Sequence, residues 1–387
     1  MGQHVKVALV HDWLTGMRGG ERCLEVFCEI FPQAHLFTLV HQRGAMSQTI
    51  ERMSIHPSWL QGVPRVTRFY RHLLPLFPAA IRQFRLAGYD LILSSSHAVA
   101  KGVSRRGSSL HICYCFTPMR YIWDQSQAYF PRDRFSPVAW ALLQMLVRYL
   151  RAWDTRTSRE VDEFVAISNN IAAKIRTYYN RSACVIPPPV DCGFFTPDSP
   201  PRQHGDAFYL IVSALVPYKR IDMAVEAFNR LRLPLVIIGN GPERSKLERG
   251  ASPHVQFLGW QPDEVVRDYY RRCEALIFPG EEDFGIVPLE AQACGKPVIA
   301  FGRGGALETV IPLNPAGRER TPIRPATGVF FYESTVEALA DAVLLFRQRA
   351  AAFDPHAIRQ NALGFDRPVF KDTIKAFLAD RTGMAIT

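Results

Sequence analysis

Residues 281–310 have the sequence EEDFGIVPLEAQACGKPVIAFGRGGALETV and combine an acidic turn, a helix-like run and an apolar strand. Glu282 and Glu290 stand eight positions apart, and Phe284 and Gly285 separate the turn from a helix expected to begin near Ile286. Free backbone N–H groups at that helix start face whatever lies beyond the preceding strand, which predicts a diphosphate site. We expect Glu282 to accept hydrogen bonds from sugar hydroxyls and Glu290 to hold a ribose diol, although acidic residues also favour helix starts for structural reasons alone.

The segments around this stretch alternate between short apolar strands and helix-like runs, which predicts parallel sheets covered by helices. Five strands are expected in the second half of the chain, at 208–212, 234–238, 255–258, 275–278 and 297–300. Six are expected in the first half, at 5–10, 34–40, 90–93, 110–114, 164–167 and 183–186. The predicted fold class is therefore α/β, with doubly wound, Rossmann-like sheets.

Proline and glycine residues concentrated between 187 and 205 predict an interdomain linker. A chain of 387 residues is long enough for two domains, which we place at 1–190 and 206–365. A last helix within residues 366–381 is expected to pack back on the first domain.

The net charge of +10 is unevenly distributed. Residues 1–190 hold 23 Lys and Arg against 12 Asp and Glu, a net charge of +11, and the remainder of the chain carries −1. Such a bias favours an anionic partner, although a solvated basic surface gives the same count. With 48% apolar residues, the chain has the composition of a folded globular protein and not of a disordered one.

The eight cysteines are scattered without metal-ligand spacing, and we expect reduced, mostly buried thiols. The N-terminal residues lack the pattern of a secretory signal, and no apolar run approaches the length that spans a bilayer. We therefore expect a cytoplasmic protein. No Asp-x-Asp pair occurs that would hold Mg²⁺ or Mn²⁺ on a diphosphate, so no metal and no cofactor is expected.

Several motifs together resemble glycosyltransferase family 4, the retaining GT-B enzymes. The segment 281–310 is similar to the E-x7-E motif of that family, and 213–222, SALVPYKRID, resembles the segment that places a lysine on the donor phosphates. Further similarity lies in Ile238–Pro242, Phe257–Trp260, Thr327–Val329 and the glycine loop at Gly19-Gly20-Glu21.

The resemblance implies a GT-B fold with an N-terminal acceptor domain, a C-terminal donor domain and catalysis in the cleft between them. Lys219 and Arg220 would supply fixed positive charge where the leaving diphosphate becomes more anionic. The residues implied in donor binding are Gly19, Gly20, Lys219, Arg220, Gly239, Gly259, Trp260, Phe284, Gly285, Ile286, Val287 and Glu290. Strings such as HDW and FTPMRYIWD are most similar to bacterial mannosyltransferases of surface polysaccharide, which favours GDP-mannose as donor and a lipid-linked or oligosaccharide acceptor.

The sequence departs from the family pattern at two positions. Ala214 stands where an arginine is common, so the phosphate clamp would rest on Lys219 and Arg220. Phe116 stands where many members carry a histidine that contacts the sugar. His97 is our candidate for that catalytic role, with a structural histidine as the alternative.

The acceptor side offers two polar and aromatic clusters at predicted strand ends. Asp12 and Trp13 follow the first strand, and Arg120 and Tyr121 follow the strand at 110–114. Asp12 is a candidate to orient an acceptor hydroxyl, and the aromatic residues are equally compatible with packing.

Two basic and apolar segments, 65–85 and 137–159, have the pattern of helices that lie on anionic membranes. A core helix is the alternative for the second segment, and a peripheral location on the inner face of the cytoplasmic membrane follows from the first interpretation.

Other functions fit less well. A catalytically impaired nucleotide-sugar-binding protein would explain Ala214 and Phe116, but not the presence of Glu282, Lys219 and Glu290 together. A nicotinamide-dependent oxidoreductase would need a Gly-x-Gly-x-x-Gly turn after a strand, and no recognisable nucleic-acid-binding module appears.

Overall fold

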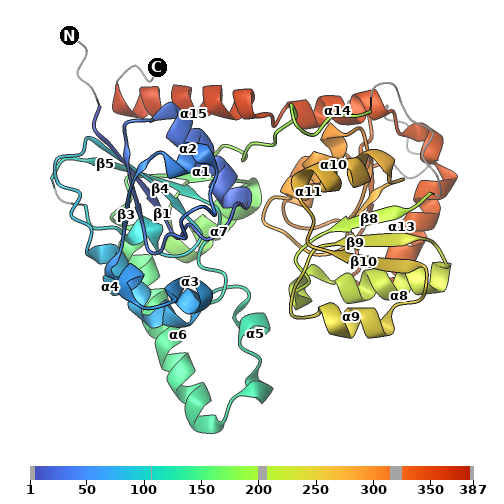
Figure 1. Ribbon diagram of the computed structural model, residues 1–387, viewed down its shortest axis with the longest axis horizontal. Coiled ribbons are helices and arrows are strands. Elements are labelled where there is room, and N and C mark those ends of the chain that lie inside the picture. The colour runs from blue at the N-terminus through green and yellow to red at the C-terminus, as the bar shows by residue number, and fades with distance from the viewer. Residues whose placement is uncertain (1–4, 106, 199–206, 314–324, 384–387) are drawn as a thin grey trace. The chain divides into compact units, whose positions relative to one another are not determined.

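The computed structural model describes residues 5–105, 107–198, 207–313 and 325–383. The chain divides into two compact units, with unit 1 comprising Met1–Pro188 and Phe370–Thr387, and unit 2 comprising Pro189–Val369. Each unit contains one parallel sheet with helices on its faces (Figure 1). The prediction of an α/β fold with two doubly wound sheets is confirmed.

The sheet of unit 1 has seven parallel strands in the order β3-β2-β1-β4-β5-β6-β7. Their bounds are β1 Val7–His11, β2 His35–Thr38, β3 Ser54–Pro57, β4 Leu91–Ser96, β5 Leu110–Cys115, β6 Glu163–Ala166 and β7 Cys184–Val185. Every residue of β1 and β4 is buried, as expected for parallel strands covered on both faces. The helices of this unit are α1 Gly19–Ile30, α2 Gln48–Glu51, α3 Val66–Phe69, α4 Phe77–Arg82, α5 Ser126–Tyr129, α6 Pro137–Ser158 and α7 Asn169–Tyr179.

The sheet of unit 2 has six parallel strands in the order β10-β9-β8-β11-β12-β13. Their bounds are β8 Tyr209–Val212, β9 Leu235–Ile238, β10 Val255–Gly259, β11 Leu276–Phe278, β12 Val298–Phe301 and β13 Gly328–Phe331. The helices are α8 Ile221–Leu231, α9 Arg244–Gly250, α10 Asp263–Arg272, α11 Ile286–Ala293, α12 Ala306–Thr309, α13 Val336–Gln348 and α14 Pro355–Leu363. In Figure 1, α8 and α9 lie on one side of these strands, and α10 and α11 lie on the other.

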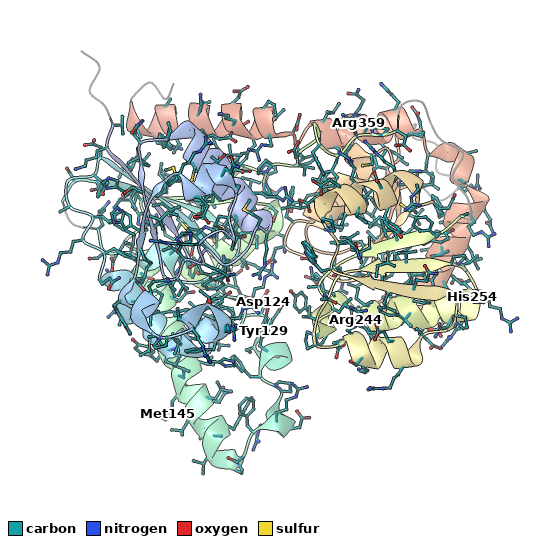
Figure 2. The ribbon with its side chains drawn as sticks, in the orientation of Figure 1. Asp124, Tyr129, Met145, Arg244, His254 and Arg359 are labelled. Atoms are coloured by element: carbon teal, nitrogen blue, oxygen red, sulfur yellow. The ribbon has the colours of Figure 1, made fainter. Side chains whose placement is uncertain are left out.

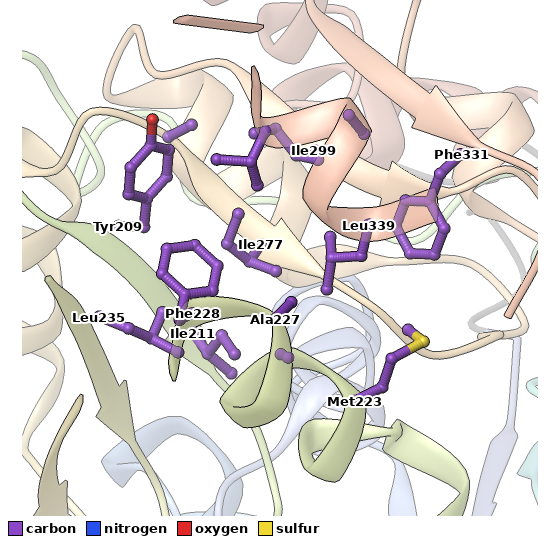
Figure 3. Packing of buried hydrophobic residues seen from close by; sticks show 14 of the residues in the cluster. Tyr209, Ile211, Met223, Ala227, Phe228, Leu235, Ile277, Ile299, Phe331 and Leu339 are labelled. Atoms are coloured by element: carbon purple, nitrogen blue, oxygen red, sulfur yellow. The ribbon is translucent and has the colours of Figure 1, made fainter. Parts of the chain in front are cut away.

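The core of unit 2 shows how helix periodicity places apolar side chains on the sheet. Ile221, Val225 and Phe228 recur along α8 at the spacing of one helical face, and all are buried. The Phe228 ring packs against the ring of Tyr209 with centroids 5.1 Å apart, and Figure 3 shows both rings among the aliphatic side chains of the neighbouring strands. This packing fixes β8, whose carboxyl end carries the loop that leads to Lys219.

The last helix, α15 Arg367–Thr382, belongs mostly to unit 1. Phe370 lies on α15 and contacts Phe27 of α1 and Tyr114 of β5, with ring centroids 5.8 and 5.7 Å apart. The C-terminal end of the chain therefore completes the core of the N-terminal unit.

Two strands of the structure, β3 and β13, were not predicted from the sequence. Part of the predicted linker is held in place by hydrogen bonds. β3 is polar and mostly exposed, so it lacks the apolar pattern of a central strand, whereas β13 is apolar and mostly buried but only four residues long, with a glycine at its start. Val190 bonds to Phe365, and Arg359, which is labelled in Figure 2, donates to the carbonyls of Cys192 and Phe195. Residues 199–206, the rest of the predicted linker, lie outside the described residues.

Candidate active site

The strand order of unit 2 reverses between β8 and β11, which pair directly although two strands, β9 and β10, separate them in the numbering. In open α/β sheets, ligands bind beyond the carboxyl ends of the strands at such a switch point. The loop after β8 leads to Lys219, and the loop after β11 carries Glu282. Lys219 and Glu282, which are both expected to act on a donor, therefore lie on loops at the edge of the sheet where ligands bind.

Glycines allow the loops at this edge to approach one another closely. A Cβ added to Gly280 would stand 2.8 Å from the Cα of Lys219, and one added to Gly305 would stand 2.2 Å from the Cα of Phe284. The Gly305 N–H also donates to the Glu282 carbonyl at 2.8 Å. The loops after β8, β11 and β12 thus form one interlocked edge, and larger residues at these glycines would separate them.

Lys219 and Glu282 form an ion pair at this edge, and both side chains are 16% exposed. An ammonium and a carboxylate at one position suit a ligand that presents anionic oxygens to the first and hydroxyl groups to the second. The structure thus brings together the two sequence candidates for phosphate and sugar recognition.

Arg220 does not join that pair. It adopts a left-handed backbone conformation with φ of 53°, and its guanidinium donates to the Ser334 hydroxyl and, at 3.4 Å, to Asp222. The sequence predicts a clamp of two adjacent cations, whereas the two side chains here have separate partners, because the backbone turn at Arg220 directs them apart.

Helix α11 begins at Ile286, as predicted, with Gly285 before it at φ of 104°. A positive φ is easily reached only by glycine, so Gly285 permits the turn between Phe284 and the helix. No side chain caps this helix start. The first N–H groups of α11, those of Ile286 and Val287 among them, have no acceptor within the helix and can donate to an anion.

Glu290 lies on the second turn of α11 and accepts a hydrogen bond from the Tyr270 hydroxyl at 2.9 Å. Tyr270 is fully buried on α10, and burial followed by the charge of Glu290 raises the pKa of its hydroxyl well above the usual range. Tyr270 is absent from the sequence candidates, because the period of α10 marks it only as a core position.

The remaining donor candidates of unit 2 lie beyond β9 and β10. The Gly239 N–H donates to the Gly259 carbonyl at 2.8 Å, which joins the ends of the two strands. Trp260 follows and is 72% exposed. Arg244, labelled in Figure 2, bonds to Asn240 in the same region at 2.8 Å. The strand ends thus present a large aromatic face that the protein core does not use.

Unit 1 has the same kind of switch point between β1 and β4, and Asp12 occupies it. The Asp12 carboxylate is fully buried and accepts the backbone N–H groups of residues 97, 98, 99 and 100 at 2.7–2.9 Å. His97 Nδ1 lies 3.1 Å from the same carboxylate. These five donors surround Asp12, so the geometry gives it a structural part in the turn after β4, in contrast to the suggested contact with an acceptor hydroxyl.

His97 and Phe116 lie close together beside the first strand. Their ring centroids are 6.3 Å apart, and the His97 ring stands edge-on to Trp13 at 4.4 Å. The His97 side chain is 28% exposed, whereas Trp13 is buried in the core. Burial lowers the pKa of His97 below its usual value and outweighs the opposing charge of Asp12.

The glycine loop predicted at Gly19 and Gly20 forms the start of α1. A Cβ on Gly20 would lie 3.4 Å from the Phe116 ring, so glycine leaves room for that ring. Glu21 is buried 3.8 Å from His11, and the interaction with His11 lowers its pKa although burial alone would raise it. A carboxylate is therefore held ionised at this helix start.

Arg120 and Tyr121 follow β5, as expected. Burial raises the pKa of the Tyr121 hydroxyl well above its usual value. That hydroxyl has no hydrogen-bond partner among the residues that the structure describes.

The described residues include no group of three His, Cys, Asp or Glu side chains arranged to hold a metal ion.

Comparisons with known proteins match most of unit 2 to one family. Residues 195–362 match the family model described as glycosyl transferases group 1. This part of the chain is therefore similar to the group 1 glycosyltransferases. This agrees with the family resemblance inferred from the sequence motifs.

Two curated relatives are mannosyltransferases. The GDP-mannose-dependent alpha-(1-6)-phosphatidylinositol monomannoside mannosyltransferase of Mycolicibacterium smegmatis is 31% identical over 45% of this chain and 52% of its own length. The O-antigen chain mannosyltransferase C of Escherichia coli is 31% identical over 40% of this chain and 46% of its own length. The alignments thus span about half the length of these relatives.

Among solved structures, Anabaena HepE in complex with UDP superposes with a TM-score of 0.70. It is 17% identical, and the match covers 97% of this chain and 100% of that one. This similarity extends over both units and supports the GT-B fold.

Proposed function

We propose that this protein is a retaining glycosyltransferase that moves a hexose from a nucleotide diphosphate donor to an acceptor hydroxyl without a metal ion. The observation that carries the proposal is the Lys219–Glu282 pair at the switch point of unit 2. The similarity of residues 195–362 to the group 1 glycosyltransferases supports the reaction class.

In the proposed reaction, the bond between the sugar C1 and the diphosphate oxygen breaks, and the electron pair leaves with the diphosphate. The acceptor hydroxyl oxygen forms the new bond to C1, and its proton passes to the departing diphosphate oxygen. Lys219 and the N–H groups at the start of α11 stabilise the growing negative charge, with Arg220 contributing from further along the same turn. Glu282 exchanges its contact with Lys219 for hydrogen bonds from the sugar hydroxyls. Donor binding thus separates the ion pair and gives each partner a ligand group.

The other donor contacts follow from the strand ends of unit 2. Glu290, held by Tyr270, accepts the ribose hydroxyls through its remaining lone pairs. The hydrogen bond between Gly239 and Gly259 joins the ends of β9 and β10, and Trp260 offers an exposed aromatic face to the base of the nucleoside. Phe284 is buried and supports the turn that presents the α11 start.

Unit 1 is proposed to bind the acceptor. His97 is the better candidate for contact with the transferred sugar, because Asp12 fixes its Nδ1 and its side chain remains partly exposed. Trp13 holds the His97 ring in place, and Arg120 and Tyr121 are retained as acceptor-side candidates. The glycines at the start of α1 are proposed to admit the donor phosphates.

GDP-mannose is the proposed donor, because both relatives are mannosyltransferases and the one from Mycolicibacterium smegmatis is GDP-mannose-dependent. A lipid-linked or polysaccharide acceptor follows from the same relatives, which act on a phosphatidylinositol mannoside and an O-antigen chain by name. The net charge of +11 in residues 1–190 supports an acceptor on an anionic membrane surface. In the structure, no helix of the described residues is both long and apolar enough to cross a bilayer.

The second candidate function is a nucleotide-sugar-binding protein that no longer transfers the sugar. Phe116 favours it, because its ring occupies the position near His11 and His97 where family members carry a sugar-contacting histidine. Both candidates share donor binding and differ only in turnover.

A thermal-shift screen with GDP-mannose, UDP-glucose and UDP-galactose separates the donors, because a ligand that binds the folded state raises its stability by mass action. We expect the largest rise in Tm with GDP-mannose. A donor that binds is then incubated with the protein and with a series of lipid-linked and oligosaccharide acceptors, and release of the nucleoside diphosphate is measured. Binding without release in the presence of every acceptor would favour the binding protein, and no shift with any nucleotide sugar would refute both candidates.

A further inference from the structure

The long helix α6 differs between its two halves. In the C-terminal half, Val147, Leu150 and Trp153 are buried in the core of unit 1, and Asp154 pairs with the buried Lys101. The N-terminal half extends away from the sheet of unit 1 (Figure 1). The helix is therefore a core element at one end only, which the sequence pattern could not separate into halves.

Four large apolar side chains on the extended half are exposed. Val138, Leu142, Met145 and Tyr149 have exposed fractions of 71%, 61%, 65% and 53%. Their spacing of four, three and four residues places them on one line along the helix, which we call the α6 stripe. Figure 2 labels Met145 beside the helix α6. Exposed apolar residues are common singly, but four in register are a contiguous surface that needs a partner.

Basic and aromatic side chains surround the stripe. Residues 135–147 carry no charge, whereas residues 131–159 as a whole contain six arginines and two aspartates, one of them the buried Asp154. Arg132 lies over the Trp140 ring at 5.4 Å, and Phe135 contacts the same ring. Arg148 is exposed, and Arg156 is exposed seven residues beyond Tyr149, in line with the stripe. An uncharged apolar line with tryptophan and arginine at its borders has the chemistry of the interface between lipid headgroups and acyl chains.

A second copy of the chain fits this surface less well. The stripe runs for about 17 Å of helix, and a stable protein interface buries about 800 Å² on each partner. Two copies joined through the stripe would also bring their arginines together with only Asp133 as an exposed counter-charge. An anionic lipid surface satisfies both the apolar line and the positive charge.

We propose that the N-terminal half of α6 lies in the interfacial region of an anionic lipid bilayer and attaches unit 1 to it through the α6 stripe. This contact is separate from the residues proposed for sugar transfer, and it rests on the proposed function only in placing the acceptor at a membrane. It also narrows the sequence-based expectation of two membrane segments. Residues 65–85 form the short helices α3 and α4 with a 3₁₀ turn between them, and Phe77 and Ile81 of that segment are buried.

The test is co-sedimentation of the full-length protein with phosphatidylcholine vesicles that contain or lack phosphatidylglycerol, without any nucleotide sugar. The stripe variant combines Leu142→Gln and Met145→Gln, and the charge variant combines Arg148→Gln and Arg156→Gln. Arg151 is left unchanged, because it donates to the Ile122 carbonyl and stacks on Trp123. Leu344→Gln on α13 and Leu76→Gln in the segment 65–85 are matched controls, with exposed fractions of 40% and 42%.

We expect the stripe variant to lower the partition onto anionic vesicles about tenfold, because two apolar side chains no longer enter the bilayer. The charge variant should lower binding to anionic vesicles and lose the salt dependence, and both controls should bind as the wild type does. Thermal shift by GDP-mannose, measured without vesicles, should be the same in all variants, so failure of membrane binding and failure of donor binding are distinguished.

Three results would overturn the proposal. One is wild-type protein that does not bind anionic vesicles at low salt. Another is a stripe variant that binds as well as the wild type. The third is a concentration-dependent dimer of the wild type that the stripe variant abolishes, since that would assign the surface to a second copy of the chain.

Discussion

At the switch point of unit 2, a cation and an anion meet with both side chains partly exposed, whereas at the switch point of unit 1 a carboxylate is sealed by the backbone around it. Both sheets share the same arrangement, with the second and third strands on one side of the first strand and the remaining strands on the other. The topology therefore offers an equivalent position in each unit, and the loops use it differently.

The difference lies in what the charged groups do for the fold. Asp12 satisfies four consecutive N–H groups at the turn after β4, and its removal would leave buried donors without acceptors. Lys219 and Glu282 contact each other at the surface of their unit and are 16% exposed. A residue of the first kind should control stability, and a residue of the second kind should control ligand binding and turnover.

The largest expected effect is that of Glu282→Gln on turnover. The neutral amide keeps the shape of the side chain but cannot stabilise positive charge that develops on the sugar. Loss of one such preorganised group typically costs about 2.7–4 kcal/mol, so kcat should fall about a hundredfold to a thousandfold. Measurement of kcat and of the donor Kd should show the second changing only a few-fold, since the sugar hydroxyls retain a hydrogen-bond acceptor.

Glu281→Gln is the matched control, because Glu281 is the exposed neighbour in the same turn. It should have wild-type kcat. Near-normal turnover in Glu282→Gln would show that this carboxylate takes no part in the mechanism. The proposed difference between Asp12 as a structural carboxylate and Glu282 as a functional one would then be wrong.

The next effect is on stability and concerns Asp12→Asn. The amide nitrogen cannot accept a hydrogen bond, so part of the buried N–H set at residues 97–100 loses its partner, at a cost of about 2–3 kcal/mol. Five of the six tryptophans lie in unit 1, so tryptophan fluorescence during urea unfolding follows that unit. Asp133→Asn, an exposed change in the same unit, should leave the midpoint unchanged. Unaltered stability with a large loss of transfer would instead return Asp12 to the acceptor site.

The central strands and the start of α11 were predictable from the sequence because local pattern determines them. β1 and β9 are continuous apolar runs, and Phe284-Gly285 marks the turn before the helix. β3 was not predictable, because an exposed edge strand has no apolar face to reveal it. The sequence also could not predict which half of α6 packs on the core, because an apolar pattern along a helix does not indicate whether that face contacts a sheet or the solvent.

The candidate site was predictable as a set of residues and not as a set of contacts. Lys219 and Glu282 were expected to act on the same donor because both lie in segments that resemble family motifs. The role of Asp12 depends on a turn 85 residues away in the chain, and the bond from Tyr270 to Glu290 depends on how α10 packs beside α11. Such contacts follow from the chain path, which no short motif encodes.

A smaller effect is the pH dependence of stability, which is expected in unit 1 because of one buried histidine. His111 of β5 is buried, its Nε2 lies 2.8 Å from the Ser94 hydroxyl, and burial lowers its pKa to about 4. The unfolded chain takes up this proton near pH 6.5 and the folded chain only near pH 4, so stability is full above pH 6.5 and falls as the pH drops through that window. The loss should reach about 1 kcal/mol between pH 7 and pH 5.5.

Urea unfolding followed by tryptophan fluorescence at each pH measures this dependence. His111→Gln should flatten it, whereas His254→Gln should not, because His254 is exposed in unit 2. Figure 2 labels His254. Equal slopes in the wild type and in His111→Gln would assign the acid sensitivity to another group.

The smallest expected effect is that of metal removal. In the proposed mechanism, the diphosphate meets the ammonium of Lys219 and the positive end of α11, so transfer should proceed at the same rate with EDTA and with added Mg²⁺. The informative comparison is with Lys219→Met, which should lose activity and should not regain it when Mg²⁺ or Mn²⁺ is supplied. If EDTA abolished wild-type transfer and either metal restored it, the diphosphate would be neutralised by a bound cation. Glu282 would then be a candidate ligand and not a contact to the sugar, and the exposed pair of unit 2 would have to be reinterpreted as half of a metal site.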